Sequence, residues 1–172
     1  MVADIKRRSL VRIEPLSDRH DRSAFRSGTD PLDRYLRTQA GQDIRRRVAS
    51  CFVLTDDGTT PLAFYTLAAT SIVLSDLPKS IAKRLPRYPK VPATLLGRLA
   101  VDERLRGRRY GELLLFDAFS RALRSEIATF AVVVDAKDEG AVSFYKSYEF
   151  RPLTASGNRL FMPMAEIAKL LA

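Results

Sequence analysis

The sequence has few of the side chains that build disulfides and metal centres. Its one cysteine, Cys51, has no partner in the chain, so an internal disulfide is excluded and a reducing compartment is expected. Cys51 stands in an apolar run, which predicts a buried thiol rather than a nucleophile. The one histidine, His20, is predicted to have a surface or capping role. We expect no bound metal.

Long apolar runs are missing as well. No stretch approaches the ~20 consecutive apolar residues that a membrane span requires. The N-terminus is basic but is not followed by the apolar segment of a signal peptide. The sequence also lacks the G-x-x-x-x-G-K-S/T pattern of P-loop proteins and the G-x-G-x-x-G pattern of dinucleotide-binding folds. We therefore expect a cytoplasmic protein with no membrane association, and neither of these two kinds of phosphate site.

The composition is that of one soluble globular domain over residues 1–172, with 46% hydrophobic and 28% charged residues. Lysine and arginine number 29 against 20 acidic residues, which gives a net charge of +9. A basic surface attracts polyanions over long distances, so this excess favours phosphate-rich partners. One small ligand needs only a few cations, and a nucleic acid explains the excess better. A basic protein without a nucleic-acid role is the alternative.

Apolar periodicity and turn residues predict a mixed α+β fold. We expect a sheet of six to seven mostly antiparallel strands with a partly parallel centre, flanked by helices. Strands are expected at 10–14, 49–55, 62–74, 95–101, 129–134, 150–153 and 159–162. Helices are expected at 17–25, 30–47 with Asp30 as the N-cap, 110–125, 139–148 and 164–171. Turns are expected at 56–59 and 156–158, and a short helix with an irregular, proline-rich connection at 76–92.

The stretch from Leu95 to Leu115 contains the strongest functional signal. An apolar strand ends in a charged turn that holds Gly107 and Gly111, and a helix follows. The first amides of a helix have no intrahelical acceptor, they lie at the positive end of its dipole, and glycine lets a phosphate approach the backbone. Four cations surround this turn: Arg104, Arg106, Arg108 and Arg109. The pattern predicts a diphosphate site, and a solvated connection is the alternative.

Residues 106–111, R-G-R-R-Y-G, resemble the acyl-CoA-binding motif Q/R-x-x-G-x-G/A of the GNAT superfamily of N-acetyltransferases. Arg109 stands where the motif has its middle glycine. An arginine fits such a turn if its φ stays negative, and its charge then helps to hold the phosphates of CoA. The resemblance implies the GNAT fold and an acyl-CoA ligand.

A second segment strengthens this resemblance. Residues 138–150 are similar to the GNAT signature N-x-x-A-x-x-F/Y-Y-x-x-x-G-F, with Asp138 at the asparagine position and Phe144 and Tyr145 as the aromatic pair. Glu149 replaces the usual glycine, which makes the exit from the helix less permissive. The two motifs occur in the family's order, and the resemblance covers residues 10–161.

The front half resembles one branch of the superfamily. Residues 25–28, 32–36 and 40–42 are similar to the F-x-C-G-x-x-x-L-D-x-Y/W-L-x-x-x-A-x-Q pattern of the GNAT toxins of toxin–antitoxin systems, and residues 87–89 and 96–102 resemble the same branch. This resemblance implies an acetyl-CoA-dependent toxin that acetylates the α-amino group of aminoacyl-tRNA and blocks translation. It also implies a small antitoxin, often with a ribbon-helix-helix domain, and a homodimer.

The resemblance also assigns site residues. It implies backbone hydrogen bonds between the pantetheine arm and Leu99, Ala100 and Val101, whose amides also polarise the thioester carbonyl. Tyr145 is the candidate general acid, because a phenol with a pKa near ~10 can protonate a thiolate whose conjugate acid lies near ~8.5; a packing aromatic is the alternative. The side chains of Tyr110 and Tyr148 are predicted to be structural. The remaining residues expected at the acetyl-CoA site are Arg106, Gly107, Arg108, Arg109, Tyr110, Gly111, Asp138 and Phe144.

No histidine or carboxylate stands out as a general base. At pH 7 an α-amine with a pKa of ~7.7–8.0 loses its proton for about 1 kcal/mol, whereas a lysine at ~10.4 needs about 4.6 kcal/mol. The missing base therefore favours an α-amine acceptor such as aminoacyl-tRNA, whose phosphates also match the basic surface. The alternatives are a GNAT enzyme for a small-molecule amine or a protein N-terminus, and a non-catalytic module that binds acyl-CoA or nucleic acid.

Overall fold

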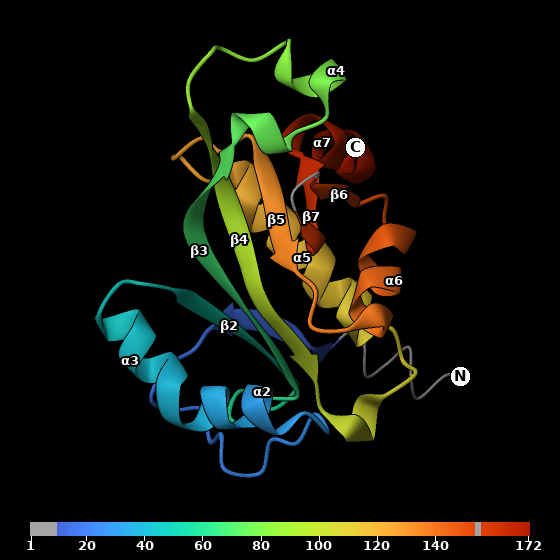
Figure 1. Cartoon of the computed structure of the whole chain (residues 1–172). Coiled ribbons are helices and arrows are strands. Elements are labelled where there is room, and N and C mark those ends of the chain that lie inside the picture. The colour runs from blue at the N-terminus through green and yellow to red at the C-terminus, as the bar shows by residue number, and fades with distance from the viewer. Residues whose placement is uncertain (1–9, 154–155) are drawn as a thin grey trace. The chain divides into compact units, whose positions relative to one another are not determined.

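The computed structural model of the chain describes residues 10–153 and 156–172. Its strands are β1 (Arg12–Pro15), β2 (Ser50–Thr55), β3 (Ala63–Val73), β4 (Lys90–Val101), β5 (Ala131–Asp135), β6 (Arg151–Leu153) and β7 (Ser156–Pro163). Within the described residues they form a seven-stranded sheet in the order β1-β2-β3-β4-β5-β7-β6 (Figure 1). β4 and β5 are parallel, whereas β1–β2, β2–β3, β5–β7 and β6–β7 are antiparallel. The predicted mixed sheet with a parallel centre is confirmed.

Most of the predicted helices are present. The α-helices are α2 (Asp30–Arg34), α3 (Ala40–Arg45), α4 (Lys79–Ala82), α5 (Tyr110–Arg124), α6 (Glu139–Ser147) and α7 (Met164–Leu171). A π-helical turn, η1 (Tyr35–Gln39), joins α2 to α3, and short 3-10 helices occur at η2 (Leu74–Asp76) and η3 (Glu103–Leu105). The helices predicted at 30–47, 110–125, 139–148 and 164–171 are therefore confirmed to within a few residues.

The chain divides into two compact units. Unit 1 comprises Met1–Leu67 and Arg98–Ala118, and unit 2 comprises Ala68–Gly97 and Phe119–Ala172. In unit 1 the core contains Phe25, Tyr35, Leu36, Ala40, Cys51, Val53, Phe64 and Ala100. In unit 2 it contains Ile72, Leu77, Val91, Ala93, Ala131, Val133, Leu153 and Phe161. Each unit thus buries apolar side chains from both sheet and helix.

The start of α2 differs by one residue from its prediction. Thr29, rather than Asp30, is the N-cap: its backbone is extended, and its carbonyl accepts from the amides of Leu32 and Asp33. Pro31 follows in the first turn, where its fixed φ suits a helix and its missing N–H is not needed. Tyr35 and Leu36 are buried, as the predicted apolar stripe requires.

The helix predicted at 17–25 is wrong. The backbone there forms short turns, such as the bond from the amide of His20 to the carbonyl of Ser17, and the amide of Asp21 donates to the carbonyl of Thr59 in another segment. His20 is buried rather than on the surface, and its Nδ1 accepts from the amide of Ser17 (3.0 Å), so that it closes a turn. Since Nδ1 accepts, Nε2 carries the proton and donates to Glu14 Oε1 (2.8 Å). Hydrogen bonds from Arg19 and then His20 lower the pKa of Glu14.

Two strand boundaries also differ. The turn predicted at 156–158 is wrong, because these residues belong to β7, where Ser156 pairs with Leu153. β4 begins at Lys90 instead of Leu95, because burial of Val91 and Ala93 in the core of unit 2 extends the strand backwards. The hairpin turn at 56–59 is confirmed, and Asp57 Oδ1 accepts from the amides of Thr59 (2.8 Å) and Thr60 (2.7 Å).

Cys51 is only 2% exposed, which confirms the buried thiol. Burial raises its pKa to about 12, so the thiol stays protonated and unreactive at neutral pH. Among the described residues, no helix has the length and apolar character to cross a membrane.

Candidate functional site

The end of β4 is fixed by a buried carboxylate. Asp102 is 1% exposed and follows directly on β4, and its amide donates to the carbonyl of Leu62. Its Oδ1 accepts from the backbone amide (3.0 Å) and Nε (2.9 Å) of Arg104, and its Oδ2 from Arg104 Nη2 (3.1 Å) and the amide of Arg26 (3.1 Å). Burial disfavours the ionised form, but these hydrogen bonds outweigh it and lower the pKa of Asp102. Arg104 is therefore bound to Asp102 rather than free for a phosphate.

The turn after Asp102 has two residues in the left-handed region. Gly107 has φ 81°, and a Cβ added there would meet no atom within 4 Å, so only the backbone conformation requires glycine. Arg109 has φ 60°, so the negative φ under which an arginine was expected to fit this turn is not adopted. The physical reason is that the chain reverses direction immediately before α5 begins at Tyr110, at the position where the related motif has glycine.

This turn presents the first amides of α5. The first hydrogen bond of the helix runs from the amide of Leu113 to the carbonyl of Arg109, so the preceding amides have no intrahelical acceptor. The side chain of Tyr110 is buried, which agrees with its predicted structural role and leaves its backbone N–H as the group for a ligand. Arg109 is exposed, with its Nη1 4.0 Å from Glu112 Oε2. Unbonded helix amides at the positive end of a dipole, next to exposed cations, are groups that suit an anion.

Arg106 connects the turn to the segment before α2. Its Nη2 donates to the carbonyl of Ser27 (3.1 Å), and Ser27 in turn donates through its amide to Asp33 (2.9 Å). Gly28 has φ 90°, and a Cβ there would lie 2.8 Å from Arg106 Nη2, so this contact needs a glycine. Arg106 therefore holds the turn in place with one of its five N–H donors.

The predicted pantetheine strand is the last part of β4. β4 pairs in parallel with β5 from Ala93 to Leu96, and the strand continues past this ladder to Val101. Ala100 is buried in the core of unit 1, so Leu99 and Val101 point to the opposite face, because side chains alternate along a strand.

Tyr145 lies in unit 2, on α6, and is 7% exposed. Its ring makes edge-to-face contacts with Phe144 (centroids 5.1 Å apart) and Phe150 (5.3 Å). Burial raises the pKa of Tyr145, so the phenol is neutral at physiological pH and carries a proton that it can donate. Its hydroxyl has no hydrogen-bond partner among residues 10–153 and 156–172.

Asp138 starts α6. Its Oδ1 accepts from the amide of Ala141 (2.8 Å), as an N-cap should, and this bond helps to position the helix that carries Tyr145. At the other end of α6, Glu149 has φ 72°, so it adopts the left-handed conformation at the position where the related signature has glycine. Phe144 is half-buried and also contacts the ring of Tyr148 (5.2 Å).

Comparison with known proteins assigns the family. The Acetyltransferase (GNAT) domain family matches residues 91–170. The chain is 33% identical over 170 residues to "Probable toxin TacT" of Sinorhizobium fredii (strain NBRC 101917 / NGR234), covering 92% of this chain and 94% of that protein. It is 34% identical over 158 residues to the "tRNA-acetylating toxin" of Mycobacterium tuberculosis (strain ATCC 25618 / H37Rv), covering 91% and 93%. The chain belongs to the GNAT acetyltransferase toxins.

Solved structures of GNAT toxins share the fold. AtaT complexed with acetyl-methionyl-tRNAfMet is 30% identical with a TM-score of 0.87, covering 94% of this chain and 99% of that one. AtaTR bound with acetyl-CoA is 27% identical with a TM-score of 0.84, covering 95% and 99%. AtaT bound to the C-terminus of the antitoxin AtaR is 26% identical with a TM-score of 0.81, covering 95% and 99%. The predicted GNAT fold is confirmed.

The structure brings the predicted residues of this GNAT toxin together in two groups. Leu99–Val101 and the turn 106–111 are consecutive parts of unit 1, joined by Asp102 and η3. In unit 2, Asp138 caps α6, which carries Phe144 and Tyr145. The sequence analysis assigned no role to Asp102, although it is the last residue of the segment 96–102 that resembles the GNAT toxins. The sequence did contain a signal for this residue, because an acidic residue directly follows an apolar strand and stands two residues before an arginine.

Proposed function

We propose that this chain transfers the acetyl group of acetyl-CoA to the α-amino group of aminoacyl-tRNA and thereby blocks translation. The observation that carries the proposal is the match along nine-tenths of the chain to the tRNA-acetylating toxin, together with a buried, neutral phenol at Tyr145. The related AtaT has been solved with acetyl-methionyl-tRNAfMet, and AtaTR with acetyl-CoA.

The donor acetyl-CoA would be held by unit 1. Its diphosphate would accept hydrogen bonds from the first amides of α5, beside Gly107, Arg108, Arg109 and Gly111. Its pantetheine arm would form backbone hydrogen bonds with Leu99–Val101, whose amides would polarise the thioester carbonyl. Arg106 would act indirectly, because its Nη2 donates to the carbonyl of Ser27 (3.1 Å) and so holds the turn in place.

Tyr145 would act as the general acid. The neutral amine attacks the thioester carbon and forms the new C–N bond, the C–S bond breaks, and the phenol proton of Tyr145 passes to the departing thiolate sulfur. The amine nitrogen releases one proton to solvent as it becomes the amide nitrogen, and the Tyr145 phenolate takes a proton back from solvent. Burial raises the pKa of Tyr145, so the phenol is protonated before the reaction begins. Positioned acids of this kind contribute about 10²–10⁴ in rate.

The amine would need no strong base. His20 donates to Glu14 in a buried turn and is not placed to abstract a proton from a substrate in open solvent. An α-amine reaches its neutral form at pH 7 for only about 1 kcal/mol, whereas a lysine needs about 4.6 kcal/mol. This difference supports an α-amine acceptor over a lysine.

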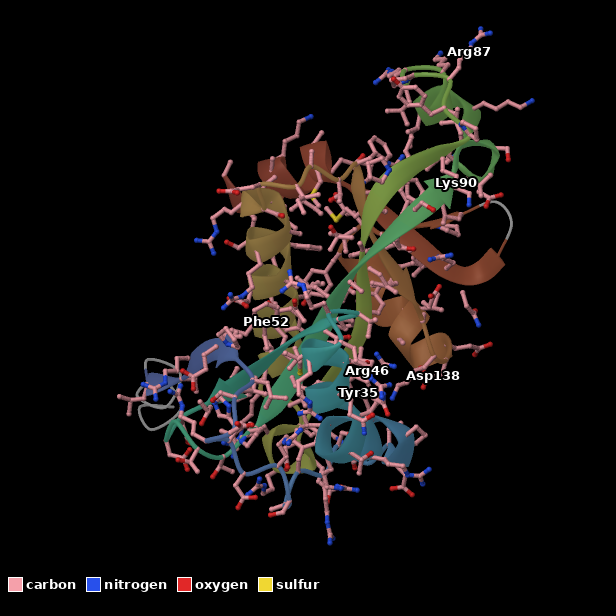
Figure 2. The ribbon with its side chains drawn as sticks, turned by 90° about the vertical axis from the view of Figure 1, so that its left-hand side faces the viewer. Tyr35, Arg46, Phe52, Arg87, Lys90 and Asp138 are labelled. Atoms are coloured by element: carbon pink, nitrogen blue, oxygen red, sulfur yellow. The ribbon has the colours of Figure 1, made fainter. Side chains whose placement is uncertain are left out.

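Basic segments in both units support a polyanionic acceptor. In unit 2, residues 79–90 contain five cations and no acidic residue. No ion pair joins Lys83, Arg84, Arg87 or Lys90 to another residue within the described parts of the chain. Arg87 lies at the outer tip of this segment (Figure 2), next to Tyr88, which is 65% exposed. In unit 1, Arg45, Arg46 and Arg47 end α3, where cations also complement the helix dipole.

The partners of the related toxins extend the proposal. AtaT has been solved bound to the C-terminus of the antitoxin AtaR. We infer a small antitoxin for this chain too, of the ribbon-helix-helix type, and a homodimeric toxin acting in the cytoplasm as one domain.

The test is label transfer from radiolabelled acetyl-CoA to total aminoacyl-tRNA. We expect label in the RNA fraction with the wild-type chain, its loss with Tyr145→Phe, and its retention with the matched variant Tyr148→Phe at the C-cap of the same helix. Label in small amines or in protein N-termini, with none in RNA, would assign a different GNAT acceptor. Acetyl-CoA binding without transfer to any acceptor would indicate a non-catalytic module.

A further inference from the structure

A stacked arginine stands immediately before the predicted pantetheine strand. The guanidinium carbon of Arg98, on β4, lies 3.6 Å from the centroid of the Tyr35 ring. A guanidinium on an aromatic face is attracted by the ring quadrupole, and the contact holds its plane in a defined orientation. Arg98 and Tyr35 both belong to unit 1.

Tyr35 is itself held firmly. Its hydroxyl donates to Asp43 Oδ2 (2.8 Å), and Gln39 Nε2 donates to Asp43 Oδ1 (3.0 Å). Its ring stacks on Phe64 at 6.3 Å with an interplanar angle of 16°. The residue begins the π-helical turn η1, a distortion that is frequent at functional sites. Burial, and then the bond with Asp43, raises the pKa of Tyr35, so the ring stays neutral and the hydroxyl remains a donor.

The donors of Arg98 are not used by the protein. The guanidinium has no hydrogen bond or ion pair with any residue in the described part of the chain, and Arg98 is half-buried. Asp43 is close enough for its pKa to be lowered by Gln39, Tyr35 and Arg98, in that order, but its oxygens are bound by the first two. Stacking occupies the face of the guanidinium and leaves the N–H donors at its edge for a ligand. Two parallel N–H groups of a guanidinium match two oxygens of a phosphate.

Arg98 lies close to the strand that is predicted to bind the acetyl donor. Arg98 is one to three residues before Leu99, Ala100 and Val101, so its Cα lies within roughly 10 Å of theirs at about 3.3 Å per residue. Its side chain lies on the same face of β4 as Ala100, which packs in one core with Tyr35. Arg46, at the end of the same helical segment (Figure 2), adds positive charge beside Asp43.

We propose that Arg98, held flat on Tyr35, binds the phosphodiester of the acceptor's terminal nucleotide. The inference rests on the proposed function, since an aminoacyl ester has no carboxylate of its own and its anion nearest to the reacting amine is the 5′ phosphate of the terminal adenosine. Arg98 is a specificity-determining residue for acceptors that carry this phosphate, and Tyr35 is its positioning residue.

The test compares two acceptors of the same amino acid, one an aminoacyl ester of adenosine 5′-phosphate and the other the aminoacyl ester of adenosine without the phosphate. Arg98→Gln is expected to lower kcat/KM for the phosphate-bearing acceptor about 10- to 100-fold, mainly through KM, because a charge-assisted hydrogen bond is lost. It is expected to leave kcat/KM for the phosphate-free acceptor unchanged. Arg98→Lys keeps the charge but not the fork, and is expected to recover only part of the loss.

Control variants separate this role from charge and from folding. Arg34→Gln removes an exposed cation from the helical segment that contains Tyr35. It is expected to change kcat/KM for neither of the two acceptors. Equal losses of kcat/KM for both acceptors, or no loss of kcat/KM with either Arg98 variant, would overturn the assignment of Arg98 to the phosphate. Label transfer to RNA by the wild-type chain would still support the proposed function in that case. A wild-type chain that acetylates neither acceptor nor aminoacyl-tRNA would instead overturn the proposed function, and this proposal with it. If Arg98→Gln does not fold, Arg98→Lys gives the same comparison.

Discussion

Asp102→Asn tests the assembly of the turn in unit 1. The wild-type carboxylate accepts four hydrogen bonds, three from Arg104 and one from the amide of Arg26. Asparagine keeps one acceptor oxygen and turns an NH₂ group toward donors, so about two of these bonds are lost. Hydrogen bonds to a charged group contribute about 1.5–3 kcal/mol each. Because the Arg104 side chain is 57% exposed, we discount its ionic part and expect a destabilisation of roughly 2–4 kcal/mol.

The assay is thermal and urea unfolding at two pH values. For a chain of this size, each kcal/mol shifts Tm by about 2–4 °C, so we expect a fall of roughly 4–16 °C at pH 7.5. The pKa of Asp102 is lowered in the folded chain, so its stabilisation is complete above the unfolded pKa of about 3.9 and is lost as pH falls through the folded pKa. The difference from wild type should therefore shrink below pH ~4.

The control is Glu103→Gln, which makes the same charge change at the adjacent exposed residue and is expected to stay within about 0.5 kcal/mol of wild type. Asp102→Asn should also weaken acetyl-CoA affinity, because η3 and the turn 106–111 follow directly from this carboxylate. Equal unfolding midpoints for the two variants would refute the idea that Asp102 organises the turn.

Three further outcomes are expected. Tyr145→Phe should lower kcat about 10²–10⁴-fold with acetyl-CoA affinity kept, and should leave the unfolding free energy nearly unchanged, since its hydroxyl has no hydrogen-bond partner among the described residues; parallel loss of activity and Tm would contradict this. Gly107→Ala should destabilise by about 1–2 kcal/mol in urea unfolding through its positive φ alone, because a Cβ there meets no atom, and a larger loss would reveal a contact. Arg87→Gln with Lys90→Gln should reduce the salt dependence of tRNA binding, with Arg124→Gln as the control; an unchanged slope would remove this segment from the interface.

Much of the site was predictable from local sequence. The turn 106–111 lies between an apolar strand and a periodic helix, and Asp138 precedes a helical run by the spacing of an N-cap, so both segments could be recognised without coordinates. The hairpin turn with Asp57 and the buried Cys51 followed from the same local signals. These features depend on neighbours within a few residues.

The errors occurred where distant segments compete for the backbone. A helix was expected at 17–25 with Ser17 as its cap, but the amide of Asp21 donates to the carbonyl of Thr59, 38 positions later in the chain, and His20 is buried. An arginine was expected to fit the turn at position 109 only with a negative φ, whereas Arg109 has φ 60°. A non-glycine residue in that region is tolerated because the surrounding turn and helix determine its conformation.

The sequence by itself determined the alternation of strands and helices, the glycine turn before α5 and the presence of a phenol on α6, because each follows from periodicity or from a short motif. Only the tertiary structure decided which charges remain available. Arg104 and Arg98 look alike in the sequence, yet one is bound to the buried Asp102 and the other lies on Tyr35 with its N–H donors free. The reason is physical: a cation's availability depends on the carboxylate or aromatic ring that folding brings beside it, and Tyr35 stands far from Arg98 in the chain.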